Sequence, residues 1–314
     1  MTFTFTFLVS LIISSFSQPA SAHLKWFVDN NQEIKSDIHY SLFSIEVLVG
    51  IVFCLMAIGA ALIINKKLTF DSKLSDTSKQ WLIRIFSILI GVSLLASSYS
   101  GSVIAAHYVV STPTLVVLQY AQAIVGLMLI FNLFTKHAAL ILIFIYAVLG
   151  LQFGLLEILD YLNILGVALY LLLSTDGDKA KNDFAIPVIR VFTGCALIVL
   201  AFSEKLLNPN LGLNFLASHN WNFMKNIGVV GYSNELFILS AGFVEMLIGI
   251  LFVFGLVTRI NTLVLLGFMI TSNLVFLFQN SISNALLELS GHLPVIAIAL
   301  ILLASGSGEK WRVK

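Results

Sequence analysis

Long apolar runs separated by short polar segments dominate the chain. Nine such runs follow an initial polar segment, at 41–64, 81–104, 115–134, 138–156, 159–174, 186–206, 236–257, 260–278 and 290–305. Most are close to the roughly 20 residues that an α-helix needs to cross a bilayer. Unbroken apolar runs must satisfy their own backbone polar groups in lipid, and they lack the alternation of a β-barrel strand. The pattern predicts an all-α, polytopic transmembrane helix bundle of about nine helices.

Composition supports this prediction and excludes several classes of function. The 314 residues are 59% hydrophobic and 11% charged, whereas soluble domains carry about 25% charged residues. The net charge of +1 gives no sign of a nucleic-acid partner. The high hydrophobic content instead indicates the lipid bilayer as the expected partner. Cys54 and Cys195 stand alone in apolar runs without metal-type spacing, which favours packing roles and leaves a disulfide between them open.

Residues 1–22 resemble a secretory signal peptide, with an apolar stretch followed by the small residues Ala20, Ser21 and Ala22. No Lys or Arg precedes the stretch, so a retained first helix is the alternative. Cleavage leaves His23 at the mature N-terminus, where its amine and imidazole offer a copper site as an alternative function. Residues 23–80 then hold an outer segment, the first membrane helix and an inner loop.

The cations between the apolar runs predict the orientation of the chain. Those near 66–79, 136, 179–181 and 259 fall on one side, together with the basic tail 306–314, and far fewer fall on the other. By the positive-inside rule the mature N-terminus lies outside and the C-terminus inside.

Three landmarks recur in the same order along the chain. The matching pairs are Arg84 with Arg190, Gly126 and Thr135 with Gly249 and Thr258 at identical spacing, and Glu157 and Asp160 with Glu288 and Gly291. Their order predicts two four-helix units of the same orientation, 81–174 and 186–305, behind one extra helix.

The two predicted units differ in intramembrane charge. Where the second has Glu204, Lys205 and Glu245, the first has Ser98, Tyr99 and Gln122. Chemistry is therefore expected in the second unit.

Glu245 is the first candidate for function because it lies near the middle of the run 236–257. A charge at that depth costs roughly 2.5–3.5 kcal/mol on insertion scales. Glu204 and Lys205 end the preceding run, and the functional interpretation joins them with Glu245 in a polar pocket that opens outward. The alternative is an interfacial pair that reaches water, with Glu245 as a structural partner of Lys205.

Further candidates surround this predicted pocket. Glu288 and His292 lie four residues apart, on one face of a helix, where they can share a proton or bind a metal, although helix capping by Glu288 is equally compatible. Arg190 lies about one turn from the inner face, where it anchors the helix or binds an anionic ligand. The aromatic loop 207–235 covers the pocket or rests on lipid.

The segment from Arg190 to Arg259 resembles the DoxX-like family of four-helix membrane proteins, whose relatives include the DoxD-type subunit of thiosulfate:quinone oxidoreductase. The resemblance rests on an Arg that opens one helix, a Lys that closes it, and a Glu-x-x-x-Gly…Gly-Leu-x-Thr-Arg pattern. In this chain these are Arg190, Lys205, Glu245, Gly249, Gly255, Thr258 and Arg259.

The resemblance implies a protein of the bacterial inner membrane that is linked to quinone or sulfur redox chemistry. The leading hypothesis is a redox component that binds a quinone or a small sulfur compound beside Glu245, with a partner redox protein on the periplasmic side. The alternatives are a transporter for a small solute or metal, and a non-catalytic scaffold or copper binder. Whether the protein is an enzyme stays open.

Overall fold

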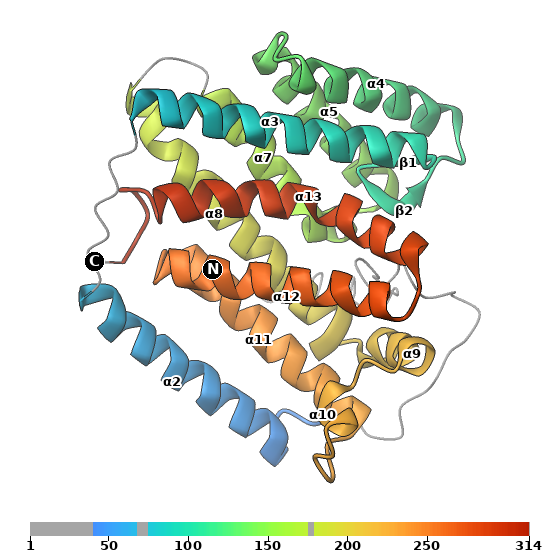
Figure 1. The fold of residues 1–314 in the computed structure, drawn as a ribbon, viewed down its shortest axis with the longest axis vertical. Helices are drawn as coiled ribbons and strands as arrows, with labels where there is room; N and C mark the ends of the chain where they lie inside the picture. The colour runs from blue at the N-terminus through green and yellow to red at the C-terminus, as the bar shows by residue number, and fades with distance from the viewer. Residues whose placement is uncertain (1–39, 68–74, 175–178, 314) are drawn as a thin grey trace, which may run out of the picture.

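The computed structural model describes residues 40–67, 75–174 and 179–313. Over these ranges it is a helix bundle with one short β-hairpin, and nine helices are long and apolar enough to cross a membrane (Figure 1). The prediction of an all-α, multi-pass membrane protein is therefore confirmed. The predicted signal peptide and His23 lie outside the described residues.

An additional helix precedes both predicted units. This helix, α2 (Ile45–Lys67), packs along α11 (Asn234–Phe254), where a Cβ on Gly50 would lie 2.4 Å from the ring of Phe243. Most other α2 side chains are exposed and apolar, as expected of a lipid-facing helix. Cys54 and Cys195 are both free thiols in the described chain, and Cys54 lies buried in this contact.

The first unit comprises the chain from α3 to α7. Its elements are α3 (Asp76–Tyr99), β1 (Ser102–Val103), β2 (Ala105–Val109), α4 (Pro113–Ile130), α5 (Thr135–Phe153), α6 (Leu155–Ile158), η2 (Leu159–Tyr161) and α7 (Leu162–Ser174). Helix α4 begins where the Thr112 side chain accepts a hydrogen bond from the Leu115 amide and Pro113 occupies the first turn. The strands form an antiparallel hairpin between α3 and α4.

The second unit comprises the chain from α8 (Lys179–Ala201) to α13 (Ile282–Ser305). The elements between these two helices are η3 (Phe202–Leu206), α9 (Pro209–His219), α10 (Phe223–Asn226), α11 and α12 (Thr258–Phe278). The segment predicted as loop 207–235 thus contains two helices. Helix α9 starts with Pro209 at its first turn and stops at Asn220, which takes the left-handed conformation.

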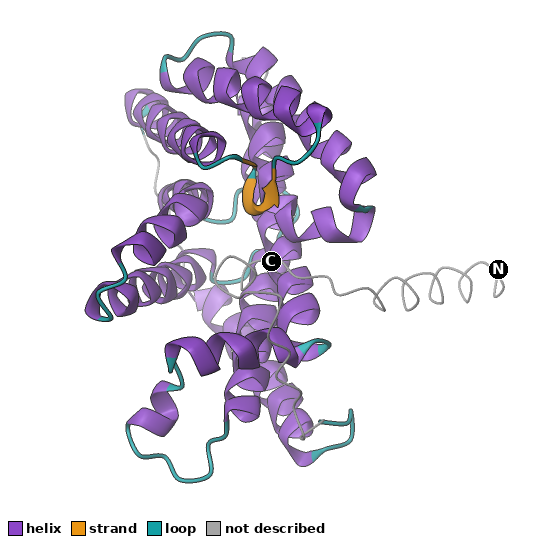
Figure 2. Cartoon of the chain, turned by 90° about the vertical axis from the view of Figure 1, so that its right-hand side faces the viewer, coloured by secondary structure: helices purple, strands orange, loops and turns teal. Residues whose placement is uncertain are grey.

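The two units pack against each other in a reciprocal way. The last membrane helix of the first unit, α7, packs on α8, and the last helix of the second unit, α13, packs on α3. Within the units, α3 packs on α4 and α8 packs on α11. Figure 1 shows α13 beside α3 in the middle of the molecule, and Figure 2 shows the hairpin as the strand element of the bundle.

The helix crossings inside the two units use paired glycines. A Cβ on Gly91 would lie 2.6 Å from the Gly126 carbonyl oxygen, and a Cβ on Gly194 would lie 2.6 Å from the Gly249 oxygen. Each crossing therefore needs glycine on both helices, as small residues allow close approach in membranes.

The turns that follow the two crossings also match. Asn132 and Phe134 are left-handed before α5, as Gly255 and Val257 are before α12. These features agree with the predicted repeat, and the duplication itself stays a prediction.

The bundle has two chemically different ends. We call the end with Arg84, Arg190 and Arg259 the arginine end, and the opposite end, with the β-hairpin and α9, the hairpin end. In Figure 1 the hairpin end lies on the right. Each of the three arginines donates to backbone carbonyls in the last turn of another helix, where the helix dipole favours a cation.

Candidate functional site

Lys205 is the centre of a charged cluster near the hairpin end. Its Nζ lies 2.7 Å from Glu245 Oε2 and 3.5 Å from Glu204 Oε2. The side chains of Lys205 and Glu245 are 14% and 22% exposed, whereas that of Glu204 is fully buried. The three predicted residues therefore come together as one ammonium between two carboxylates. We call Lys205, Glu204 and Glu245 the charged triad.

A π-helical segment and a glycine position the triad. Element η3 continues α8 with a wider turn, in which the Leu207 amide donates to the Phe202 carbonyl five residues earlier. Such π turns are rare and are frequent at functional sites. On the facing helix, a Cβ on Gly242 would lie 3.1 Å from Lys205 Cβ. The glycine lets the end of α8 approach α11 closely enough for Lys205 to reach Glu245.

Glu288 and His292 of α13 extend the set of buried ionisable groups. Glu288 Oε1 lies 3.4 Å from His292 Nδ1, and both side chains are more than nine-tenths buried. Within the described chain, Glu288 Oε2 has no hydrogen-bond partner. His292 lies within electrostatic reach of both Glu288 and Glu245. Glu288 and His292 of α13 thus join the candidates of η3 and α11 at this end of the second unit.

Among the described residues, this arrangement holds more acidic groups than basic groups. Three carboxyl groups lie around one lysine and one histidine, inside helices that are apolar enough to cross a membrane, where burial of charge is expensive. The cluster therefore combines hydrogen-bond donors and acceptors that can hold and exchange protons. In the part of the chain that the structure describes, no group of three or more His, Cys, Asp or Glu side chains is arranged to hold a metal ion.

Helix α9 and an aromatic cluster cover the hairpin end of the second unit. Leu213, Phe215 and Leu216 of α9 are buried in one cluster with Ile238, Phe276 and Ala285, which come from α11, α12 and α13. His219 stacks on Phe215 with ring centroids 4.6 Å apart. The predicted lid segment therefore packs on the helix ends. With this end covered, the partial exposure of Lys205 and Glu245 favours access from the side of the bundle.

Arg190 is not part of this cluster. It is fully buried at the arginine end, where its guanidinium donates to the carbonyl oxygens of Phe252, Val253, Ser307 and Trp311. These bonds tie the end of α11 to the C-terminal tail, which is the anchoring role considered for Arg190.

The remaining motif residues have structural roles at the same end. Gly255 adopts a left-handed conformation against the Arg190 guanidinium, and Arg259 donates to Leu303 and Ala304 at the end of α13. Thr258 begins α12, and its carbonyl accepts from the Thr262 hydroxyl at 2.7 Å. Gly249 forms the crossing with Gly194.

In the first unit, Gln122 occupies the position that sequence pairs with Glu245. It is fully buried; its Oε1 accepts from the Ile104 amide and its Nε2 donates to the Leu94 carbonyl. Gln122 therefore fastens the β-hairpin to α3 and α4. The neutral amide of Gln122 provides both an acceptor and a donor, whereas an ionised carboxylate can only accept.

Sequence reasoning missed one contact of the second unit with the first. Ser203 Oγ donates to Asp160 Oδ1 at 3.1 Å, and both residues are buried. In the sequence, Asp160 is singled out only as the counterpart of Gly291 in the predicted repeat. An acidic residue predicted inside a membrane helix is the signal that points to such a partner.

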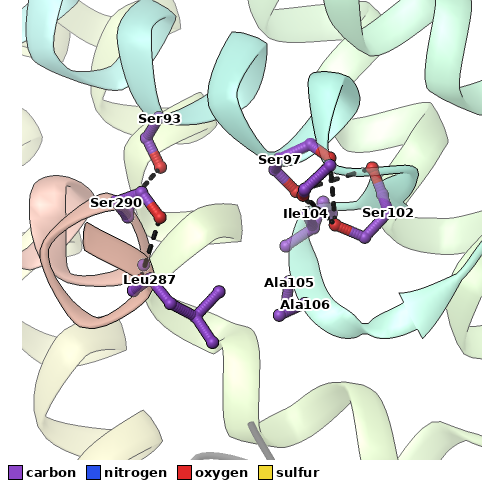
Figure 3. A pocket seen from close by; sticks show the side chains of 10 residues that line it. Ser93, Ser97, Ser102, Ile104, Ala105, Ala106, Leu287 and Ser290 are labelled. Carbon is purple, nitrogen blue, oxygen red and sulfur yellow. Dashed lines mark hydrogen bonds between the residues drawn. The ribbon is translucent and has the colours of Figure 1, made fainter. Parts of the chain in front are cut away.

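A small pocket lies at the other contact between the units, between α3, the hairpin and α13 (Figure 3). Its cavity volume is about 20 Å³, which is room for about one water molecule. Ser93, Ser97, Ser100, Ser102 and Ser290 contribute to its lining. The Ser93 hydroxyl donates to the Ser290 carbonyl at 2.8 Å. The charged triad is not part of this pocket.

Residues 185–277 match the family model described as DoxX, in agreement with the resemblance that the sequence predicted for this segment. The match covers the charged triad and the glycine crossing of the second unit, and it ends before α13. No curated protein and no solved structure matches the chain.

Proposed function

We propose that this DoxX-domain membrane protein is a component of a quinone- or sulfur-linked redox system, with the charged triad as its binding and proton-exchange site. The observation that carries the proposal is the ion pair between Lys205 and Glu245, partly exposed at membrane depth and backed by the buried Glu204. Buried ionisable groups of this kind mark ligand and proton sites in membrane proteins.

The proposed chemistry follows from the donors and acceptors in the triad. The Lys205 ammonium donates to a quinone oxygen or to an oxygen of a small sulfur anion. Glu245, which is on the exposed side, exchanges the proton that accompanies electron transfer. Glu204 keeps Lys205 charged, and His292 with Glu288 supplies a second proton acceptor. The electrons come from the bound substrate or from a partner redox protein.

A direct test compares charge removal at the site with charge removal elsewhere on the same helix. The wild-type protein, Glu245→Gln and Glu235→Gln are purified in lipid nanodiscs, and the quinone that co-purifies and the quinol-linked reductase activity are measured. We expect Glu245→Gln to lose quinone and to lower the activity about a hundredfold, with Glu235→Gln like wild type. Equal quinone content and activity in all three proteins would reject the proposal.

A transporter is the second candidate, and discontinuous helices favour it. One membrane crossing is divided into α6, the 3₁₀ segment η2 and α7, and η3 interrupts the regular turn of the adjoining α8. Broken helices are common at substrate sites of transporters. Uptake of thiosulfate or of a divalent metal by proteoliposomes, abolished in Glu245→Gln, would select this function over the redox role.

The location and the unit structure belong to the same proposal. We infer that the protein lies in a bacterial inner membrane with its arginine end facing the cytoplasm, because the basic segments gather there. We also infer that the units 81–174 and 186–305 are two copies of one four-helix element. Labelling of single cysteines at Ser100 and Lys310 with a membrane-impermeant reagent tests the orientation, since only position 100 is then accessible from outside.

A further inference from the structure

The chain between α9 and α11 exposes apolar side chains at the hairpin end of the molecule. We call this segment, residues 220–233 with α10 inside it, the tip loop. Val230 is 99% exposed, Ile227 73% and Phe223 56%. Phe223 and Ile227 are four residues apart on the α10 turn, so they lie on one side of it. Exposed apolar side chains that gather in this way mark an interaction surface.

Many polar groups of the tip loop bond within the loop. Asn222, which is 2% exposed, donates from its side-chain amide to the Tyr232 carbonyl at 3.1 Å, and its side-chain oxygen accepts from the Lys225 amide at 3.1 Å. The amides of Ile227 and Val229 donate to carbonyls of the α10 turn. A segment whose backbone is bonded internally loses little hydrogen bonding when it leaves water, so this loop is suited to an environment of low dielectric constant.

The tip loop is fixed to the start of a membrane helix. The Tyr232 hydroxyl donates to Ser240 Oγ at 2.8 Å, and Ser240 lies in the second turn of α11. The rings of Phe223 and Phe237 meet edge to face, with centroids 5.1 Å apart. Because α11 is long and apolar enough to cross a membrane, these contacts hold the loop at the level where the helix enters the lipid.

The lipid-facing surface of the bundle reaches the same level. Tyr40 and Val47, at the start of α2, pack in one cluster with Leu236 of the first α11 turn. Beside them Phe43 is 87% exposed and Ile45 is 73% exposed. Figure 1 shows the start of α2 and α10 at the same end of α11. The apolar residues of the tip loop therefore continue a surface that faces lipid.

The other residue types of the tip loop suit the boundary between lipid headgroups and acyl chains. Trp221 and Tyr232 are partly buried, and each ring carries one polar group, as is common for aromatic residues at membrane interfaces. Lys225 is exposed, and a lysine in such a place reaches the headgroups while its methylene groups stay in apolar surroundings. Apolar residues with flanking aromatic rings and a cation are typical of interfacial segments.

We propose that the tip loop inserts into the lipid leaflet at the hairpin end, with Phe223, Ile227 and Val230 among the acyl chains and Lys225 at the lipid phosphates. The partner of this surface is the leaflet itself. Of the two roles considered for segment 207–235, α9 takes the covering role and the tip loop takes the contact with lipid. The loop thereby anchors the start of α11 at the membrane surface, whatever chemistry the charged triad performs.

The experiment measures the depth of a nitroxide spin label at position 230 from its collision rates with oxygen, which concentrates in lipid, and with a water-soluble nickel chelate. Val230→Cys is labelled in the full chain with Cys54→Ala and Cys195→Ala, in nanodiscs of phosphatidylcholine and phosphatidylglycerol. Leu55→Cys, at a 64% exposed position in the middle of α2, is the lipid reference. Lys310→Cys, in the exposed tail, is the water reference.

We expect the ratio of oxygen to nickel collision rates at position 230 to exceed that at position 310 severalfold and to approach that at position 55. A ratio equal to that at position 310 would place the loop in water and overturn the proposal. Low collision rates with both reagents would show that protein, such as a second copy of the chain, covers the tip loop, which also overturns it.

A second readout keeps the test decisive if the spin label displaces the loop. Val230→Trp adds one indole to the protein, and we expect lipids with brominated acyl chains to quench the emission that this indole adds to the wild-type signal. Unquenched emission would contradict insertion. Neither readout depends on quinone or on reductase activity, so failure of the redox proposal and failure of this one are distinguishable.

Discussion

The two contacts between the units differ in polarity at positions that correspond in sequence: one holds a carboxyl group and the other holds a glycine and serines. Where α7 and η2 meet α8, the buried Asp160 accepts from Ser203. Where α13 meets α3, the residue that sequence pairs with Asp160 is Gly291, and a serine-lined pocket with room for about one water remains. One interface therefore holds a carboxyl group beside the charged triad, and the other holds hydroxyl groups and space.

The difference shows where this bundle concentrates the cost of burying charge. The second unit places three carboxyl groups around one lysine and one histidine, and the first unit adds Asp160 to the same region. Elsewhere the first unit uses neutral groups at matching positions, such as Gln122, whose amide satisfies the hairpin. A single charged region shared by both units costs less than two separate ones, because its members can share partners and protons.

Removal of Lys205 is expected to have the largest effect. Lys205→Met leaves Glu204 and Glu245 without their cation, and breaking a buried ion pair in this way costs about 3–5 kcal/mol of folding free energy. The matched change in the first unit, Tyr99→Met, alters an exposed side chain and should stay within about 0.5 kcal/mol. Unfolding in detergent, followed by circular dichroism, measures both. Equal effects would contradict the contrast between the units.

Introducing a carboxylate into the first unit should destabilise the protein more than removing a carboxylate from the second unit. Gln122→Glu removes the donor to the Leu94 carbonyl and buries a charge without a cation, which we expect to cost about 2–3 kcal/mol. Glu245→Gln keeps an acceptor for Lys205 and should cost less. The same unfolding measurement ranks the two variants, and the opposite ranking would show that position 122 already accommodates charge.

The two arginines that correspond in sequence should also differ. Within the described residues, Arg190 is fully buried and bonds to four carbonyl groups, whereas Arg84 makes one bond, 3.3 Å long, to the Leu129 carbonyl. We expect Arg190→Met to cost about 2 kcal/mol and to release the C-terminal tail, because charge-assisted bonds are lost. Limited trypsin digestion near Lys310 detects the released tail, and Arg84→Met serves as the control that leaves it protected.

The smallest predicted effects should be alike in both units. Gly126→Ala and Gly249→Ala each push a methyl group against a facing backbone oxygen, at 2.9 and 2.6 Å, and should cost about 1–2 kcal/mol. Gly267→Ala is the matched control, since a Cβ there meets nothing within 4 Å. The melting temperature of each variant measures the effect. A decrease for only one of Gly126→Ala and Gly249→Ala would argue against the predicted repeat.

Much of the architecture was predictable from the sequence, and part of the site was too. The apolar runs located the nine membrane helices, although the span predicted as 159–174 begins at Leu155 in the structure, with α6 and η2. The grouping of Glu204, Lys205 and Glu245 was predicted from their depth alone. Helix α9 was not predicted, because its apolar residues pack only after the ends of three other helices have met.

The sequence by itself determined that this chain is a multi-pass membrane protein, which segments cross the bilayer, and which side chains are too costly to leave unpartnered there. These properties depend on local composition and on the free energy of transfer into lipid. Only the tertiary structure decided which groups these side chains contact: Arg190 donates to backbone carbonyls, Ser203 donates to Asp160, and Lys205 pairs with two carboxylates. Such pairings depend on the rotation and crossing of whole helices, which are set by packing across the bundle and have no local signature in the chain.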